Sequence, residues 1–156
     1  MAKRAIARAD VALCLFDASE GIVAQDLTVA GLVGDGGRGA ILVVNKWDLV
    51  EDREAAYKAL KKEADARLRF SRFSPFLTIS ALEGQRVDAV FELIDRVYAA
   101  GDVTVPTPQL NRFLTEFRAG YDGATRGPKL RYLTQVGVRP PTFLAFGPAA
   151  GLLHFS

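Results

Sequence analysis

Three short apolar runs stand out in the first eighty residues and predict buried strands. They begin at Val11 ("VALCLFDAS"), at Ala40 ("AILVVNKWD") and at Ser74 ("SPFLTISAL"). None of them alternates between apolar and polar positions, which is typical of strands in a parallel sheet that is covered on both faces. Each run ends in polar or small residues, at the point where the chain would leave the sheet.

The segments between and after these runs show the residue spacing of helices. Residues 25–33, 51–70 and 87–99 carry apolar side chains three or four positions apart, the period of an amphipathic helix. The stripes in the two longer segments are Ala56, Leu60, Ala64 and Leu68, and then Val90, Leu93, Ile94 and Tyr98. Strands that alternate with helices predict an α/β fold with an open parallel sheet.

The pattern changes after residue 103 and predicts a second, smaller α+β domain. In "GDVTVPTPQLNRF" we expect a linker and then a helix, with Thr107 as its cap, Pro108 in its first turn, and Leu110, Phe113, Leu114 and Phe117 on its apolar face. "LRYLTQVGVRPPTFLAFG" predicts two strands. We therefore divide the chain into domains 1–103 and 104–156.

Composition and charge narrow the class of protein. The chain has 156 residues, of which 49% are hydrophobic and 24% charged, as in globular proteins. No apolar run approaches the ~20 residues of a membrane helix, so we expect no membrane partner. Cys14 is the single cysteine, which excludes an internal disulfide, and a cytoplasmic location is expected.

The charge is unequal between the two domains. Residues 104–156 carry six Lys/Arg and two Asp/Glu, whereas residues 1–103 carry 14 and 16. A basic C-terminal third is suited to nucleic acid. The alternative, a small imbalance on a solvated face, is equally compatible with the charge alone.

Candidate ligand-binding residues come directly after the second apolar run. They are Asn45, Lys46 and Asp48. In open α/β sheets ligands bind beyond the carboxyl ends of the strands. A carboxylate there can accept two parallel hydrogen bonds from N1 and the exocyclic N2 of guanine, a pair that adenine lacks. The stem of Lys46 can lie over a flat ring, and Asn45 can tie the loop. The alternative is a plain polar turn.

A second loop, Ser80 and Ala81, follows the third apolar run. One of its backbone N–H groups can donate to O6 of guanine, whereas the amino group of adenine would leave that donor unpaired. The alternative is a helix cap at Ser80. The two loops together, on adjacent strand ends, are far more specific than either loop alone.

Five stretches together resemble the EngA/Der family of ribosome-assembly GTPases. They are "ADVALCLFDASEGIVAQD", "ILVVNKWDLV", "TISALEGQRVDAVFELIDRVY", "PTPQLNRFL" and "LRYLTQVGVRPPTFLAFG" with the terminal "LLHFS". The family has two tandem GTPase domains and a C-terminal KH-like domain. The resemblance begins inside the second GTPase domain and ends inside the KH-like domain, so we expect the chain to be a fragment.

The resemblance implies a function for particular residues. It assigns Asn45, Lys46 and Asp48 to the guanine-specificity motif, and Ser80 with Ala81 to the loop that supports it. It implies GTP or GDP as ligand, and a ribosomal subunit or ribosomal RNA, not DNA, as partner. Trp47 occupies the variable position of the motif, where we expect it to pack against the following helix.

The phosphate-binding half of such a site is missing from the sequence. GTP hydrolysis requires a Gly-rich loop that ends in Gly-Lys-Ser/Thr. The stretch "GDGGRGA", residues 34–40, lacks that ending and precedes a strand, so we expect a turn. Asp17 in "DASEG" is one residue too far from its glycine to match Asp-x-x-Gly, and we expect a capping or loop role for it. Mg²⁺ is therefore expected only in the longer parent protein. We assign no catalytic residue and expect no activity from this chain alone.

RNA contact is the alternative function that the sequence leaves open. Lys129, Arg131 and Arg139 are the candidate side chains for RNA phosphate. The usual KH signature, a Gly-x-x-Gly loop between two helices, is absent, so the KH-like assignment rests on the resemblance. The chain would then act as an RNA- or ribosome-binding module without nucleotide. An unrelated α/β domain with an accidental motif is disfavoured by the second loop and by the C-terminal match.

Overall fold

The structure is a computed structural model that describes residues 2–120 and 130–147. The chain divides into two compact units, residues 1–100 and residues 101–156. The first unit is α/β and contains a three-stranded sheet, while the second contains one helix and a two-stranded sheet in its described part.

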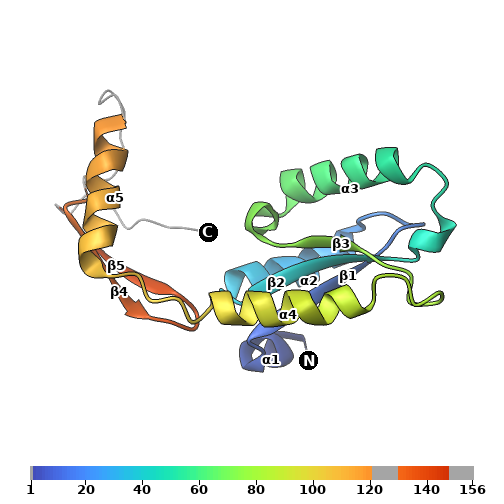
Figure 1. Ribbon diagram of the computed structural model, residues 1–156, viewed down its shortest axis with the longest axis horizontal. Coiled ribbons are helices and arrows are strands. Elements are labelled where there is room, and N and C mark those ends of the chain that lie inside the picture. Colours follow the sequence, from blue (N-terminus) through green and yellow to red (C-terminus); the bar gives the residue numbers. More distant parts are fainter. Residues whose placement is uncertain (1, 121–129, 148–156) are drawn as a thin grey trace. The chain divides into compact units, whose positions relative to one another are not determined.

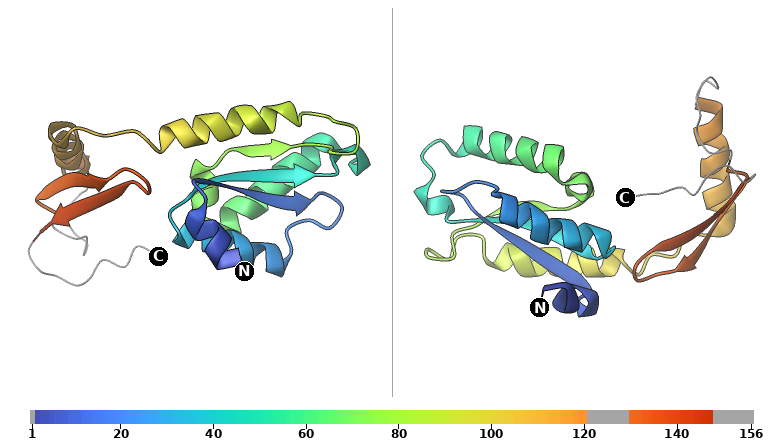
Figure 2. Two further views of the ribbon diagram at one scale, coloured as in Figure 1. Left: turned by 90° about the horizontal axis from the view of Figure 1, so that it is seen from below. Right: turned by 180° about the vertical axis from the view of Figure 1, so that it is seen from behind.

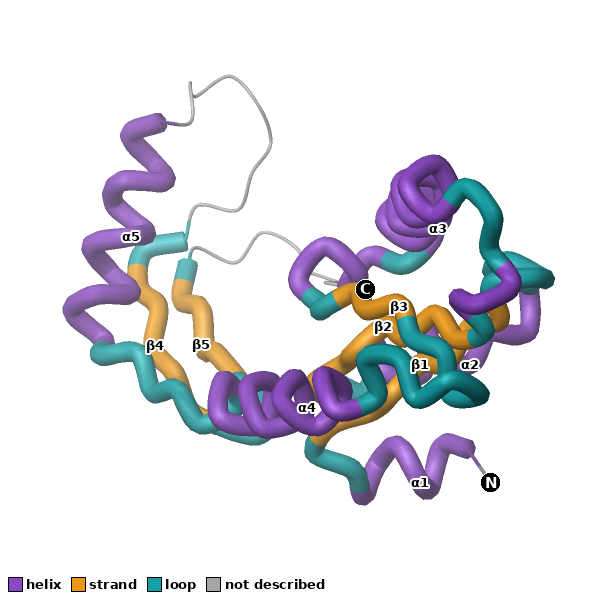
Figure 3. The backbone as a smooth tube through the Cα atoms, turned by 45° about the vertical axis from the view of Figure 1, so that its right-hand side comes forward, coloured by secondary structure: helices purple, strands orange, loops and turns teal. Residues whose placement is uncertain are grey.

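A parallel sheet forms the centre of the first unit (Figures 1 and 3). Its strands are β1 (Val11–Asp17), β2 (Gly39–Asn45) and β3 (Phe76–Thr78), in the order β1-β2-β3. The three apolar runs therefore form parallel strands, as the sequence predicts. The central strand β2 is buried on both faces, and residues 41–44 are at most 1% exposed.

Helices cover both faces of this sheet (Figure 2, left). On one face lie α1 (Ala2–Arg8), α2 (Ala24–Asp35) and α3 (Arg53–Arg67), and on the other lies α4 (Asp88–Ala100). Successive side chains of a strand point to opposite faces. Leu42 and Val44 accordingly pack with α2 and α3, whereas Ile41 and Val43 pack with α4.

The helices follow the predicted apolar stripes with three differences. Leu60, Ala64 and Leu68 are buried, as expected, but α3 ends at Arg67 and not at residue 70. Leu68 has extended dihedral angles, and a 3₁₀ helix, η2 (Arg69–Phe73), leads to β3. Tyr98 is 46% exposed, and Val97 packs against the sheet in its place. Helix α1 was not predicted.

One edge of the sheet is only half covered. Within the described residues β1 pairs with β2 alone. Leu13 and Leu15, which lie beside Ile41 and Val43 on the face of α4, are 40% and 55% exposed.

The second unit is built from α5 (Thr107–Gly120), β4 (Tyr132–Gly137) and β5 (Thr142–Phe146). The two predicted strands are present; they pair antiparallel, and residues 138–141 connect them. Leu110 and Leu114 are buried, but Phe113 and Phe117 of the predicted apolar face are more than half exposed. The two phenylalanine rings stack on each other, with centroids 6.2 Å apart.

Polar side chains join the parts of the second unit. The Asn111 amide binds both backbone groups of Leu133: its Nδ2 donates to the carbonyl at 2.9 Å, and its Oδ1 accepts from the N–H at 3.0 Å. Thr107 is the first residue of α5, and its hydroxyl lies 3.0 Å from that of Thr134 in β4. Gln135 accepts from the Val105 N–H at 2.7 Å.

Candidate functional site

The carboxyl ends of the three strands lie together, as a parallel sheet requires. Asp17 at the end of β1 is opposite Asn45 at the end of β2. Three hydrogen bonds then join the end of β2 and the residues after it to the loop after β3. The Ile79 N–H donates to the Val44 carbonyl at 2.8 Å, the Trp47 N–H donates to the Ile79 carbonyl at 3.0 Å, and the Ala81 N–H donates to Asn45 Oδ1 at 3.0 Å. The structure thus brings the two predicted loops together.

Lys46 has an unusual backbone conformation at this point. Its backbone is left-handed, with φ 63° and ψ 36°, a conformation that residues other than glycine and asparagine seldom adopt. A short 3₁₀ helix, η1 (Trp47–Leu49), follows. The turn leaves the Lys46 side chain 52% exposed while Trp47, only 6% exposed, joins the apolar cluster that includes Leu60 and Ala64 of α3.

Asp17 holds the Lys46 ammonium group. The Lys46 Nζ lies 2.5 Å from Asp17 Oδ2, and Asp17 Oδ1 accepts hydrogen bonds from the N–H (2.8 Å) and the hydroxyl (2.6 Å) of Ser19. The hydrogen bond from Lys46, followed by those from Ser19, lowers the pKa of Asp17 from 3.8 to about 2. The same contact raises the pKa of Lys46.

Asp17 has a second role besides the loop role expected from the sequence. Its bonds to Ser19 are the loop role that was expected, but its pairing with Lys46 was missed. The available signal was positional, because a residue that ends one parallel strand lies beside the residue that ends the next. The ends of β1 and β2 line a small hollow of about 210 Å³. Its lining residues are Leu15, Phe16, Asp17, Asn45 and Lys46.

Asp48 carries an oxygen that is buried without a partner. Its Oδ1 atom is shielded from solvent and accepts no hydrogen bond from any described residue. A buried acceptor without a donor costs about 1–3 kcal/mol. Such an atom at the ligand-facing end of a sheet is a candidate acceptor for a donor that a ligand brings.

Ser80 and Ala81 use their backbone N–H groups within the chain. The Ser80 N–H donates to the Gln85 carbonyl at 3.1 Å, and the Ala81 N–H donates to Asn45, as described above. The Ser80 hydroxyl accepts from the Glu83 N–H at 3.1 Å. Ser80 therefore caps the tight turn after β3, not helix α4, which begins only at Asp88.

The described residues form no ready-made cage of protein ligands for a metal ion. Mg²⁺ requires several oxygen ligands in near-octahedral geometry. Among residues 2–120 and 130–147, no three His, Cys, Asp or Glu side chains come together in a way that would hold a metal. Asp17, the nearest carboxylate to the hollow, already has a cation against it, because the Lys46 ammonium group lies 2.5 Å from Oδ2.

The three candidate RNA contacts have different surroundings. Arg131 is exposed beside the first residue of β4, and its N–H donates to the Phe146 carbonyl at 2.6 Å. The Arg139 guanidinium forms a two-pronged ion pair with Asp102, and its side chain is 24% exposed. Lys129 lies outside the described residues.

In the described part of the chain, no helix is long and apolar enough to cross a membrane.

Sequence profiles of two known families match this chain. Residues 1–100 match the elongation factor Tu GTP-binding domain, and residues 104–156 match the KH-domain-like C-terminal region of EngA bacterial GTPases. The GTPase Der of Caldanaerobacter subterraneus is 41% identical over 97% of this chain, and that of Syntrophotalea carbinolica is 41% identical over 98%. The chain spans 35% and 36% of the lengths of these two relatives.

Solved structures share the fold of the first unit. Aquifex aeolicus Era, bound to GDP and aluminium fluoride, superimposes with a TM-score of 0.53 at 23% identity, over 61% of this chain and 31% of Era. Methanococcus maripaludis elongation factor SelB, bound to a GTP analogue, gives a TM-score of 0.55 at 23% identity, over 62% of this chain and 22% of SelB. The α/β sheet of the first unit is therefore of the GTPase type. With the profile matches over residues 1–100 and 104–156, the chain belongs to the EngA/Der family of GTPases.

Proposed function

We propose that this chain carries the base-recognition half of a guanine-nucleotide site, formed by Asn45, Lys46, Asp48, Ser80 and Ala81. The observation that carries the proposal is the buried, unpaired Oδ1 atom of Asp48 at the carboxyl end of the sheet. A guanine base brings two adjacent N–H donors to such a carboxylate.

Lys46 would cover the base with its aliphatic stem. Its left-handed backbone directs the side chain out of the sheet, and the ion pair with Asp17 restrains the ammonium group. A restrained side chain loses less conformational freedom when a ligand binds than a free one does. Asp17 is thus a positioning residue in this proposal, acting on the base through Lys46.

Ala81 would donate its N–H to O6 of the base. In the structure this N–H donates to Asn45 Oδ1. Binding of guanine would therefore exchange one acceptor for another and would release the Asn45 oxygen. Adenine offers an amino group at the same place, which cannot replace the lost acceptor.

The phosphate half of the site would come from a longer parent protein. No Gly-x-x-x-x-Gly-Lys-Ser/Thr stretch occurs among the 156 residues, and curated relatives are nearly three times as long. We therefore propose that the parent binds and hydrolyses GTP with Mg²⁺, and that this chain is a part of it that lacks hydrolytic activity.

Calorimetric titration of the chain with GDP, guanosine and ADP tests this function. We expect weak binding of GDP and guanosine with similar affinity, because the contacts of the chain are to the base, and still weaker binding of ADP. Micromolar GDP affinity would show that the phosphates are bound after all. Equal affinity for GDP and ADP would contradict base recognition by Asp48.

A second candidate function is contact with a ribosomal particle through the KH-like unit. It is favoured by the profile match of residues 104–156 and by the exposed Arg131. Arg139 would contribute only if its ion pair with Asp102 opened, and Lys129 remains a prediction. Co-sedimentation of the chain with ribosomal subunits should weaken in Arg131→Glu and remain unchanged in Arg112→Glu on the exposed side of α5. Equal loss in both variants would indicate a non-specific charge effect.

A further inference from the structure

Charge is segregated within the first unit. Residues 53–73, which form α3 and η2, carry seven Lys/Arg and three Asp/Glu, whereas the rest of residues 1–100 carries seven Lys/Arg and twelve Asp/Glu. The helix and the turn after it therefore form a cationic surface on a unit that is otherwise acidic. Local potentials of this kind attract polyanions whatever the net charge of the protein.

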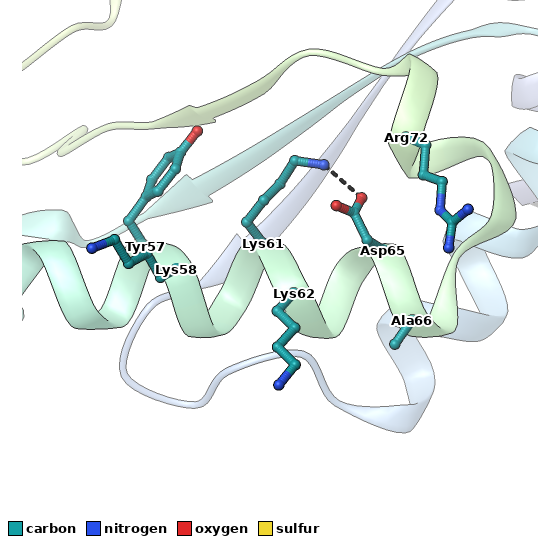
Figure 4. A pocket seen from close by; sticks show the side chains of 7 residues that line it. All are labelled: Tyr57, Lys58, Lys61, Lys62, Asp65, Ala66 and Arg72. Carbon is teal, nitrogen blue, oxygen red and sulfur yellow. Dashed lines mark hydrogen bonds and ion pairs between the residues drawn. The ribbon is translucent and has the colours of Figure 1, made fainter.

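An open hollow of about 520 Å³ lies on this surface (Figure 4). Its lining consists of Tyr57, Lys58, Lys61, Lys62, Asp65, Ala66 and Arg72. Tyr57, Lys61 and Asp65 point from the same side of α3, as side chains four residues apart do. Arg72 extends from η2 beside Asp65.

The one carboxylate of the hollow is already neutralised. Asp65 accepts from the Lys61 ammonium group at 2.5 Å and from the Ser71 hydroxyl at 2.7 Å. Lys58 is paired with Glu54, which lies outside the hollow, but both side chains are more than 70% exposed, so this pair is weak. Within the described residues, Lys62 and Arg72 have no ion pair or hydrogen bond, although the charge of Arg72 helps to lower the pKa of Asp65. Two cations thus remain available to a ligand.

We propose that the hollow on α3 and η2 binds the phosphate backbone of single-stranded RNA, with Lys62 and Arg72 as the main phosphate contacts. Lys58 and Lys62 are separated by about 6 Å along the helix, so the surface presents repeated charges to a chain of repeated phosphates. The guanidinium of Arg72 presents a planar fork of donors that matches phosphate oxygens.

Tyr57 favours RNA over an acidic polypeptide as the ligand. Tyr57 is 39% exposed and lines the hollow, and its ring packs edge-to-face against Phe76, with centroids 5.3 Å apart. Aromatic rings beside cationic grooves bind single strands by stacking on their bases. An acidic polypeptide would use the cations but not the ring. The surface is separate from the guanine site, because Arg72 precedes the start of β3 whereas that site follows the ends of the strands.

Filter binding of radiolabelled oligouridylate to the full chain, at several salt concentrations, tests the proposal. We expect Lys62→Glu with Arg72→Glu to weaken binding about tenfold or more, and to lower the slope of log affinity against log salt by about 1.4, since each phosphate contact on a single strand contributes about 0.7. The matched control is Arg4→Glu with Arg96→Glu, two exposed cations on α1 and α4 with the same change of charge. The control should bind with less than about a twofold change and an unchanged slope.

A third variant and a competitor separate RNA from other polyanions. Tyr57→Leu keeps an apolar side chain against Phe76 and should weaken binding about fivefold or more without altering the salt slope. Polyglutamate at equal charge should compete poorly. The proposal is overturned if the unsubstituted chain does not bind oligouridylate at low salt, if both double variants weaken binding equally, if Tyr57→Leu has no effect, or if polyglutamate competes as well as RNA. Circular dichroism confirms that each variant is folded.

Discussion

The Ala81 N–H donates to the side-chain oxygen of Asn45 at 3.0 Å, across a separation of 36 residues in the sequence. This hydrogen bond fastens the turn after β3 to the end of β2. Asn45 is thereby a structural residue as well as a candidate ligand-binding residue.

Replacement of Asn45 by alanine should loosen the loop at Ala81. The lost hydrogen bond is expected to lower the free energy of unfolding by about 1 kcal/mol. Hydrogen exchange at the Ala81 amide should become faster than in the unsubstituted chain. Leu82→Ala, in the same turn at a side chain that is 87% exposed, is the control and should change stability by less than about 0.5 kcal/mol. Unchanged exchange at Ala81 in Asn45→Ala would show that the bond does not hold the loop.

Removing either of two carboxylates between β2 and α3 should change the free energy of unfolding, but in opposite directions. Asp48→Ala removes the buried, unpaired oxygen and should raise the free energy of unfolding by about 1 kcal/mol, while abolishing any preference for GDP over ADP. The Asp52 side chain caps α3 by accepting from the Ala55 N–H at 3.0 Å. Asp52→Ala removes this cap and should lower the free energy of unfolding by about 1 kcal/mol. Thermal unfolding and calorimetric titration measure the two effects. A loss of stability in Asp48→Ala would mean that this carboxylate already has a favourable partner.

The ion pair of Asp17 with Lys46 should be visible in the titration of the carboxyl group. The folded pKa of about 2 lies below the value of 3.8 in the absence of these contacts. The stabilisation by Asp17 is therefore fully present above pH 3.8 and is lost as the pH falls through about 2. The ¹³C chemical shift of the Asp17 carboxyl group measures the midpoint.

Variants then separate the causes of that lowered pKa. Lys46→Met should move the pKa of Asp17 upward toward 3.8, and Ser19→Ala should move it less, because the hydrogen bond from Lys46 is the larger cause. A larger shift in Ser19→Ala than in Lys46→Met would reverse this order and remove Asp17 as the residue that restrains Lys46.

Asn111 should be essential to the second unit. In Asn111→Ala the N–H and carbonyl of Leu133 lose their partners, and the free energy of unfolding is expected to fall by about 2 kcal/mol. Hydrogen exchange at Leu133 and thermal unfolding measure the loss. Arg112→Ala, the next position along α5 with a side chain that is 74% exposed, should be nearly neutral. Unchanged protection at Leu133 would show that the Asn111 amide does not pair with β4.

The strands and most helices could be predicted because their signal is local. Continuous apolar residues of β2 and the four-residue stripe of α3 reflect burial directly, and both occur as expected. The end of α3 could not be predicted in this way. Leu68 continues the stripe, but it is buried in extended conformation after the helix has ended, and Ser71 in η2 then bonds back to Asp65.

The sequence predicts which residues form the candidate site, and their role stays a prediction, but the sequence does not predict their hydrogen bonds. The motif placed Asn45 and Asp48 at a strand end, and the parallel sheet brings the loop of Ala81 beside them. The use of the Ala81 N–H by Asn45, and the pairing of Lys46 with Asp17, depend on contacts between segments far apart in sequence. No local pattern of apolar and polar residues encodes such contacts. For the same reason, the role of Asn111 as a partner of β4 was missed.

The position of Trp47 provides an optical probe of the candidate site. It is the only tryptophan of the chain, and it lies between Lys46 and Asp48 with its ring in the apolar cluster against α3. Fluorescence excited at the red edge of indole absorption therefore arises from this one ring. Its emission should be blue-shifted by the apolar surroundings. Any movement of the loop on ligand binding should then change the spectrum of the unlabelled chain.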